Sequence, residues 1–246
     1  MVAEAAVWFR TGAGATGIAG GLSFALIGVV YAPLLIIQQV AAQRLLSLGE
    51  LAPVRRLAWG AGVMLSALAA AIAFTPLGVV IFRDLVGVQD AILDEALSAM
   101  TALWPVPLLT GVRALHQGRL VAGHRTGPIA AATGARTAVL AVVAFTLAAT
   151  PVGAWLGGVA FTAGLAAEAL YVTLARARLP ERSEASDIES AGEDRLLSFS
   201  TPLMLNVMLW WSTPLIINSV LARTPEPDCS IAAFTVVEAE IGRAHV

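Results

Sequence analysis

The segment TGAGATGIAGGLSFALIGVVYAPLLIIQQVAAQ, residues 11–43, decides the fold. It holds no charged residue over a length greater than the roughly 20 residues that a helix needs to cross a bilayer. The whole chain of 246 residues follows the same pattern, since 58% of it is hydrophobic and 13% is charged, against about 25% charged residues in an average soluble domain. So few charges cannot cover the surface of a soluble domain. The sequence therefore predicts a polytopic membrane protein.

Five further apolar stretches follow the first. None of them alternates with period two over about ten residues, as the strands of a membrane barrel do, so we expect an all-α bundle of about six transmembrane helices. The third stretch is the weakest, because Trp104-Pro105-Val106-Pro107 interrupts it. Pro33, Pro76 and Pro214 also fall inside predicted spans, where proline bends a helix. The predicted spans are residues 17–43, 57–82, 91–120, 128–150, 152–175 and 196–222, and residues 231–237 are expected to open a seventh.

All basic residues of the chain are arginines, and their positions predict its orientation. Basic residues in short loops between spans remain on the cytoplasmic side. We therefore expect the first span to enter from outside, in a bacterial inner (plasma) membrane. The acids Asp84, Asp90, Asp94 and Glu95 lie on the arginine-poor side. That side holds Arg10, Arg83 and Arg223, whereas the other holds Arg44, Arg55, Arg56, Arg113, Arg119, Arg125, Arg136, Arg176, Arg178, Arg182 and Arg195.

One polar segment, residues 176–195, divides the chain. It carries four arginines and six acids, a composition typical of a linker between two bundles. We expect residues 1–175 to form a first lobe, the segment itself to be a cytoplasmic linker, and residues 196–240 to begin a second lobe. The last six residues, 241–246, back-translate to a string that resembles the core of short-read sequencing adapters. They are expected to be read-through.

A short internal repeat predicts a longer parent protein. Duplicated halves are common in transporters. If the repeat is real, residues 1–10 end a helix equivalent to the sixth span, and the parent holds two repeats of roughly 213 residues. Residues Val7, Arg10, Thr11, Ile18, Ala19 and Gly20 recur 213 positions later as Val220, Arg223, Thr224, Ile231, Ala232 and Ala233.

Ionisable residues inside predicted spans are candidates for function, because they are costly in lipid and usually face a cavity or a partner. Glu168 is the only acid in the middle of a span, and Tyr171 follows it on the same predicted helix face. Arg136 lies inside the fourth span. Each residue has an alternative to a functional role. Glu168 could lie near the cytoplasmic interface, and Arg136 could extend its side chain to the lipid headgroups.

Two further groups of polar residues are candidates. Arg113, His116 and Gln117 share one helix face by their spacing, and such a basic patch attracts anions or phosphates. Its alternative is an ordinary cytoplasmic loop. Asn206 and Asn218 lie on the sixth span, where hydrogen bonding between helices is the alternative to a binding role.

Several classes of chemistry lack a sequence signal. His116 and His124 have no third metal ligand nearby, and neither a Walker phosphate loop nor a G-x-S-x-G motif is present. We predict no cofactor and no metal. A basic face of the kind that binds nucleic acid is missing, and the single Cys229 cannot form an internal disulfide.

Several short motifs together resemble the first lobe of the MOP flippase superfamily, and within it the progressive ankylosis protein family. The resemblance implies twelve helices in two six-helix lobes facing a central cavity, with the six spans here as helices two to seven. It covers most of residues 15 to 238, without helix one and most of the second lobe. The motifs are Thr75-Pro76-Leu77-Gly78, Val106-Pro107, Arg113-x-x-His116-Gln117-Gly118-Arg119-Leu120, Arg125-Thr126, Phe199-x-x-Pro202-Leu203, Pro214-Leu215-Ile216 and Ala222-Arg223.

The resemblance implies export of small anions such as pyrophosphate, citrate or nucleotides, whereas relatives export drugs or flip lipid-linked sugars. We therefore expect part of a secondary transporter or flippase that works by alternating access without covalent chemistry, in a lipid bilayer, with a small anionic or amphiphilic substrate. Whether a coupling ion takes part is left open. Arg113, Gln117 and Arg136 are the expected substrate contacts, with Glu168 as counter-charge or proton site. The alternatives are a lipid-modifying membrane enzyme built on His116 and His124, or a membrane scaffold that transports nothing.

Overall fold

The computed structural model describes residues 15–48, 52–147, 153–177 and 191–221, together with residues 223, 224, 230, 233, 234 and 237. Every regular element in this part of the chain is helical, and six helices are long and apolar enough to cross a membrane. The predicted all-α membrane bundle is therefore confirmed. The expectations for residues 1–14, for most of the predicted linker, for most of residues 231–237 and for 241–246 lie outside the described residues.

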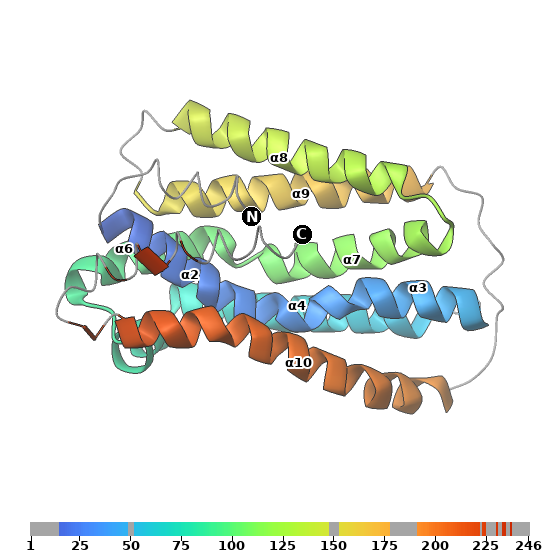
Figure 1. Cartoon of the computed structure of the whole chain (residues 1–246), viewed down its shortest axis with the longest axis horizontal. Coiled ribbons are helices and arrows are strands. Elements are labelled where there is room, and N and C mark those ends of the chain that lie inside the picture. Colours follow the sequence, from blue (N-terminus) through green and yellow to red (C-terminus); the bar gives the residue numbers. More distant parts are fainter. Residues whose placement is uncertain are drawn as a thin grey trace.

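The helices pack lengthwise into one bundle (Figure 1). The first span runs through three consecutive elements, and the third is built from two helices end to end. The elements are α2 (Ala15–Tyr31), η1 (Ala32–Ile36), α3 (Ile37–Leu48), α4 (Ala52–Phe74), α5 (Pro76–Val79), η2 (Val80–Val86), α6 (Asp90–Leu103), α7 (Val106–Ala122), α8 (Gly127–Leu147), α9 (Trp155–Ala177) and α10 (Ala191–Leu221).

Proline explains most of the breaks. Pro33 lies in the 3-10 segment η1, which bends the first span between α2 and α3. Pro76 begins α5, and the Thr75 side chain caps that helix by accepting a hydrogen bond from the Leu77 N–H at 3.3 Å. The second span therefore ends at Phe74, and its predicted extension to residue 82 is wrong, because the Thr-Pro pair starts a new helix.

The third span breaks where the sequence predicts. α6 ends at Leu103 and α7 begins at Val106, since a proline has no N–H to continue the helical hydrogen bonds. The Ser66 hydroxyl of α4 accepts the Leu108 N–H at 2.9 Å. One of the donors at the start of α7 therefore finds its partner on another helix.

The helix α10 differs from its prediction at its start. It is continuous from Ala191 to Leu221 in spite of Pro202 and Pro214, so Pro214 does not divide it. Because α9 extends to Ala177 and α10 begins at Ala191, both ends of the predicted linker belong to helices. Only residues 178–190 separate the two, and they lie outside the described part.

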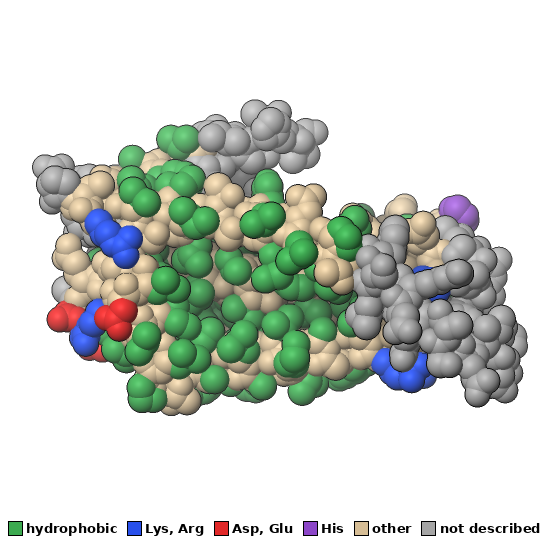
Figure 2. Space-filling model, turned by 90° about the horizontal axis from the view of Figure 1, so that it is seen from below, with side chains coloured by type: hydrophobic (Ala, Val, Ile, Leu, Met, Phe, Trp, Pro, Cys, Tyr) green, Lys and Arg blue, Asp and Glu red, His purple; other side chains and the backbone are tan. Residues whose placement is uncertain are grey.

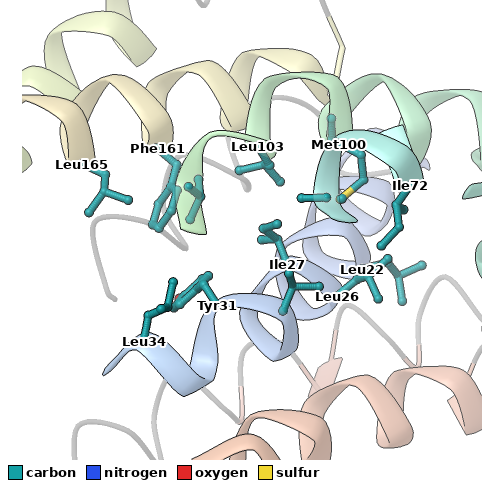
Figure 3. Close-up of a cluster of buried hydrophobic side chains, with 14 of the residues drawn as sticks. Leu22, Leu26, Ile27, Tyr31, Leu34, Ile72, Met100, Leu103, Phe161 and Leu165 are labelled. Carbon is teal, nitrogen blue, oxygen red and sulfur yellow. The ribbon is translucent and has the colours of Figure 1, made fainter. Parts of the chain in front are cut away.

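The core of the bundle is apolar and is formed by α2, η1, α3, α4, α6, α7 and α9. Leu22 of α2 lies near Ile72 of α4 and Met100 of α6 in this core, and Phe161 of α9 lies beside Leu103 and Leu165 (Figure 3). On the outside, α4 and α10 expose large apolar side chains. Charged side chains gather at the two ends of the visible face, which leaves an uncharged band between them (Figure 2). Such a band is typical of a helical bundle that lies in lipid.

The helices alternate in direction. Figure 1 places the C-terminal ends of α3, α7 and α9 at one end of the bundle, with the N-terminal ends of α8 and α10. This is the arginine-rich end of the sequence analysis. At the opposite end, Arg223 donates to the Leu85 carbonyl at 3.0 Å, and Arg83 pairs with Asp90 at 2.6 Å. The six apolar helices indicate an integral membrane protein.

Candidate functional site

Four predicted residues from three helices meet inside the bundle. Arg113 and Gln117 lie on α7, Arg136 on α8 and Glu168 on α9. Each charged member is nine residues from a helix end: Arg113 from the end of α7, Glu168 from the end of α9, and Arg136 from the start of α8. At 1.5 Å per residue, all three lie about 14 Å inside the arginine-rich end. We call these four residues the Glu168 cluster.

The carboxylate of Glu168 is the acceptor at the centre of the cluster. Gln117 Nε2 donates to its Oε1 at 2.9 Å. Arg113 Nη1 contacts Oε1 at 3.3 Å and Oε2 at 3.2 Å, and Arg136 Nη1 contacts Oε2 at 3.4 Å. Both carboxylate oxygens therefore have donors, and two cations share one anion.

Burial makes this arrangement unusual. The Glu168 side chain is 2% exposed, while those of Arg113 and Arg136 are 16% and 18% exposed. With two arginines and one carboxylate, the cluster carries a formal charge of +1 when Glu168 is ionised. Arg113 Nε is also buried and has no hydrogen-bond partner among the described residues. The cluster thus holds one buried donor, Arg113 Nε, that Glu168 does not satisfy.

Small and aromatic residues place Arg136 against α9. Its guanidinium lies over the Phe161 ring, 4.9 Å from the centroid, which is a favourable cation–π geometry. Gly164 lies between Phe161 and Glu168 on α9, and a Cβ there would be 3.0 Å from the Arg136 carbonyl oxygen. The absence of a side chain at Gly164 therefore permits the close approach of α8 and α9 beside the cluster.

Apolar layers lie on both sides of the cluster along the bundle. Toward the arginine-rich end, Leu120, Ala132 and Val172 pack together, and each has no exposed surface. Toward the other end, Phe161 and Leu165 join the main core. A ligand that reached the cluster from the arginine-rich end would have to pass the first layer.

Not every predicted site residue lies in the cluster. The half-buried His116 has a buried Nδ1 without a hydrogen-bond partner in the described structure, and the hydrogen bonds to Glu168 there come from Arg113, Gln117 and Arg136. Asn206 is exposed on α10. Asn218 lies on the same helix and is buried, and its Oδ1 has no hydrogen-bond partner among the described residues. Tyr171 is 41% exposed, so the prediction that it shares the face of the buried Glu168 is wrong. A residue three positions on is rotated by about 60°, enough to turn it outward.

Two alternatives from the sequence are also corrected. Arg136 points inward to Glu168 and Phe161 instead of reaching to headgroups. Arg113 and Arg136 lie nine residues inside α7 and α8, away from the helix ends where loop arginines lie, so neither counts toward orientation. The arginine-rich side then keeps nine arginines against three, and the alternation is unchanged.

Sequence reasoning missed two supporting residues. Phe161 precedes Glu168 by seven positions, a spacing that repeats a helix face and could have paired the two. Glu95 of α6 accepts the Ala154 N–H at 2.8 Å and so caps the start of α9. Gly153, at φ 60°, has no Cβ to meet that carboxylate. The sequence places Glu95 only among four acids on the arginine-poor side, and nothing in its local sequence indicates a partner 59 positions away.

The described residues contain no group of three or more His, Cys, Asp or Glu side chains that could hold a metal ion. Comparisons with protein-family models, with curated proteins and with solved structures find no match for this chain. The family resemblance therefore stays a prediction, and the function has to be inferred from the cluster.

Proposed function

We propose that this chain belongs to a secondary transporter or flippase of the MOP type that exports a small anion by alternating access, with the Glu168 cluster as its anion site. The observation that carries the proposal is the pair of partly buried arginines around the buried carboxylate of Glu168, inside a bundle of apolar helices. Charges in this position are costly, and in membrane proteins they mark substrate and ion pathways. No covalent step is part of the proposal.

The chemistry of the donors favours an oxyanion. Arginine presents several N–H groups in a planar fork that matches carboxylate and phosphate oxygens. Gln117 adds a neutral donor from the same side as Arg113. A small carboxylate or phosphate is therefore the substrate class, in agreement with the anions that the family resemblance implies.

The layers around the cluster supply a barrier for alternating access. Leu120, Ala132 and Val172 close the site toward the arginine-rich end, which we take to be cytoplasmic by the distribution of arginines. Leu120, Ala132 and Val172 come from three different helices. A small movement of α8 relative to α7 and α9 would open this layer without breaking the helices. Export then requires this layer to open before the anion binds and to close before release.

The experiment is transport by the chain reconstituted in lipid vesicles. We expect entry of labelled citrate or pyrophosphate that saturates with concentration and falls at least tenfold in the double variant R113Q/R136Q. The matched control is R55Q/R56Q, which removes two arginines from the first turns of α4 rather than from the cluster. Equal transport by the cluster variant and the control, with both folded, would contradict the proposal.

A further inference from the structure

The carboxylate of Glu168 occupies the position that a bound oxyanion would take. Its two oxygens receive donors from Arg113, Gln117 and Arg136, which are the groups that would bind a carboxylate or phosphate ligand. We propose that Glu168 is an internal substitute for the substrate: ionised, it occupies the donors, and protonated, it releases them to one oxyanion, so that proton and anion bind together. This inference rests on the proposed function and names its coupling ion.

The charge of the cluster supplies the first reason. The formal charges of Arg113, Arg136 and Glu168 sum to +1 with Glu168 ionised and to +2 with Glu168 protonated. Taking a carboxylate partner from a partly buried arginine is unfavourable, and two anions in one small site repel each other. A protonated Glu168 with one monovalent anion restores +1. The two favourable states therefore have the same charge, and exchange between them moves a proton with an anion.

The contact geometry supplies the second reason. The arginine contacts to Glu168 measure 3.2 to 3.4 Å, longer than the roughly 2.7 to 2.9 Å of strong charge-assisted hydrogen bonds. The buried Nε of Arg113 is unused in the described structure. A free oxyanion, unlike a side chain fixed to α9, can move to satisfy these donors at shorter distances. Displacing Glu168 therefore loses little and gains new hydrogen bonds.

Other titratable groups near the cluster have to be separated from Glu168. α7 adds His116 and Arg119, α9 adds Tyr171 and Arg176, and α8 adds no second charged group beyond Arg136. The acids of α6 lie toward the far end, where Glu95 caps the start of α9, and the described part of α2 holds only Tyr31. Of these, only histidine ordinarily titrates between pH 5 and 8. His116 is therefore the necessary control.

The proton step is simple in chemical terms. A proton from water on one side of the membrane adds to a Glu168 oxygen, which turns a carboxylate into a carboxylic acid and breaks no other bond. The anion enters as the carboxylate leaves its donors, and the proton is released again when Glu168 returns to them. For a monovalent anion, one cycle moves no net charge.

The test measures binding of trifluoroacetate to the purified full chain by fluorine NMR, at pH 5 and pH 8. This probe is a carboxylate that stays ionised across the range. We expect the wild type to bind more weakly at pH 8, by at most about tenfold per pH unit, the limit for one coupled proton. E168Q should bind at both values as tightly as the wild type at pH 5, and H116Q should behave as the wild type does.

A second readout uses no substituted protein. When trifluoroacetate is added to the wild type in weak buffer at pH 8, the protein should take up close to one proton for each anion bound. Binding without proton uptake, or weaker binding by folded E168Q, would overturn the inference and leave the anion site intact. Two outcomes would overturn the proposed function itself. In the first, the wild type binds no trifluoroacetate at either pH; in the second, the wild type and R113Q/R136Q bind it with the same affinity.

Discussion

The two halves of this bundle bury different chemistry. In the half formed by α2, α4 and α6, the interior is filled with large apolar side chains such as Leu22, Ile27 and Met100. Where α8 packs against the C-terminal parts of α7 and α9, the interior holds two arginines around Glu168, with a small apolar group beside them. Apolar packing needs no explanation beyond stability. Buried charge in a membrane bundle costs stability, so its presence points to function.

Removing the central charge is expected to have the largest effect. E168Q keeps the volume of the side chain but leaves Arg113 and Arg136 without their shared anion. We expect the free energy of unfolding to fall by about 3–5 kcal/mol at low ionic strength, measured by denaturant titration of the purified protein. Added sulfate should recover part of this loss, since a ligand that binds only the folded state stabilises it.

The matched control for that variant is E168D, which keeps the charge on a shorter side chain. It should lose less stability than E168Q and gain less from sulfate. If E168Q and E168D lose equal stability and sulfate affects neither, the carboxylate contributes packing rather than charge, and the contrast between the two halves disappears.

Truncation in the apolar half should separate stability from binding. Leu22 is 1% exposed, and L22A leaves a cavity among α2, α4 and α6. We expect a loss of about 2–3 kcal/mol, at the lower end of the range for buried leucine, because lipid is as apolar as the core and the transfer contribution is small. The folded fraction should bind trifluoroacetate with unchanged affinity. A shift of more than about threefold in that affinity would show that the halves are not independent.

Two glycines of α9 allow the two halves to be compared on one helix, because Gly158 lies against α6 and Gly164 lies against α8. A Cβ at Gly158 would be 2.8 Å from the Ala99 carbonyl oxygen of α6, whereas one at Gly164 would be 3.0 Å from that of Arg136. Overpacking is expected to cost about 1–2 kcal/mol in either variant. G158A should leave anion affinity unchanged, and G164A should weaken it severalfold by displacing Arg136. G134A, where a Cβ meets nothing within 4 Å, is the control for both. Equal anion affinities in G158A and G164A would refute this assignment.

The smallest effect is expected at an exposed ion pair. Arg83 and Asp90 are 2.6 Å apart, but their side chains are 50% and 79% exposed. R83Q should therefore change the free energy of unfolding by less than about 1 kcal/mol and leave binding unchanged. A loss comparable to that of E168Q would mean that proximity alone, and not burial, determines the cost of losing a charge partner in this protein.

Composition and charge spacing predict much of this molecule. Six apolar stretches, the break at Pro105 and the candidates Arg113, Gln117, Arg136 and Glu168 all follow from the sequence, because lipid penalises charge so strongly that each buried ion is conspicuous. The convergence of four of the candidates could not be predicted, since it depends on how three helices rotate about their axes. Tyr171 illustrates the problem. A rotation of about 60° about the helix axis separates it from the buried Glu168 and places it on an exposed face of α9.

Long-range contacts and local backbone effects account for the remaining differences between the structure and the sequence predictions. The capping of α9 by Glu95 and the bond from Leu108 to Ser66 join residues far apart in the chain, and no local pattern indicates them. The end of the second span at Phe74 depends on whether Thr75-Pro76 bends a helix or starts a new one. Hydropathy alone does not distinguish these outcomes, because the residues directly before and after the break are both apolar.

The most direct measurement is the dissociation constant of trifluoroacetate for E168Q and for the wild type at pH 8, compared under identical conditions. If Glu168 occupies an anion site formed by Arg113, Gln117 and Arg136, removing its charge frees the donors, and E168Q should bind at least tenfold more tightly. Equal or weaker binding by a folded E168Q would contradict the account, because Glu168 would then not compete with an anion for these arginines.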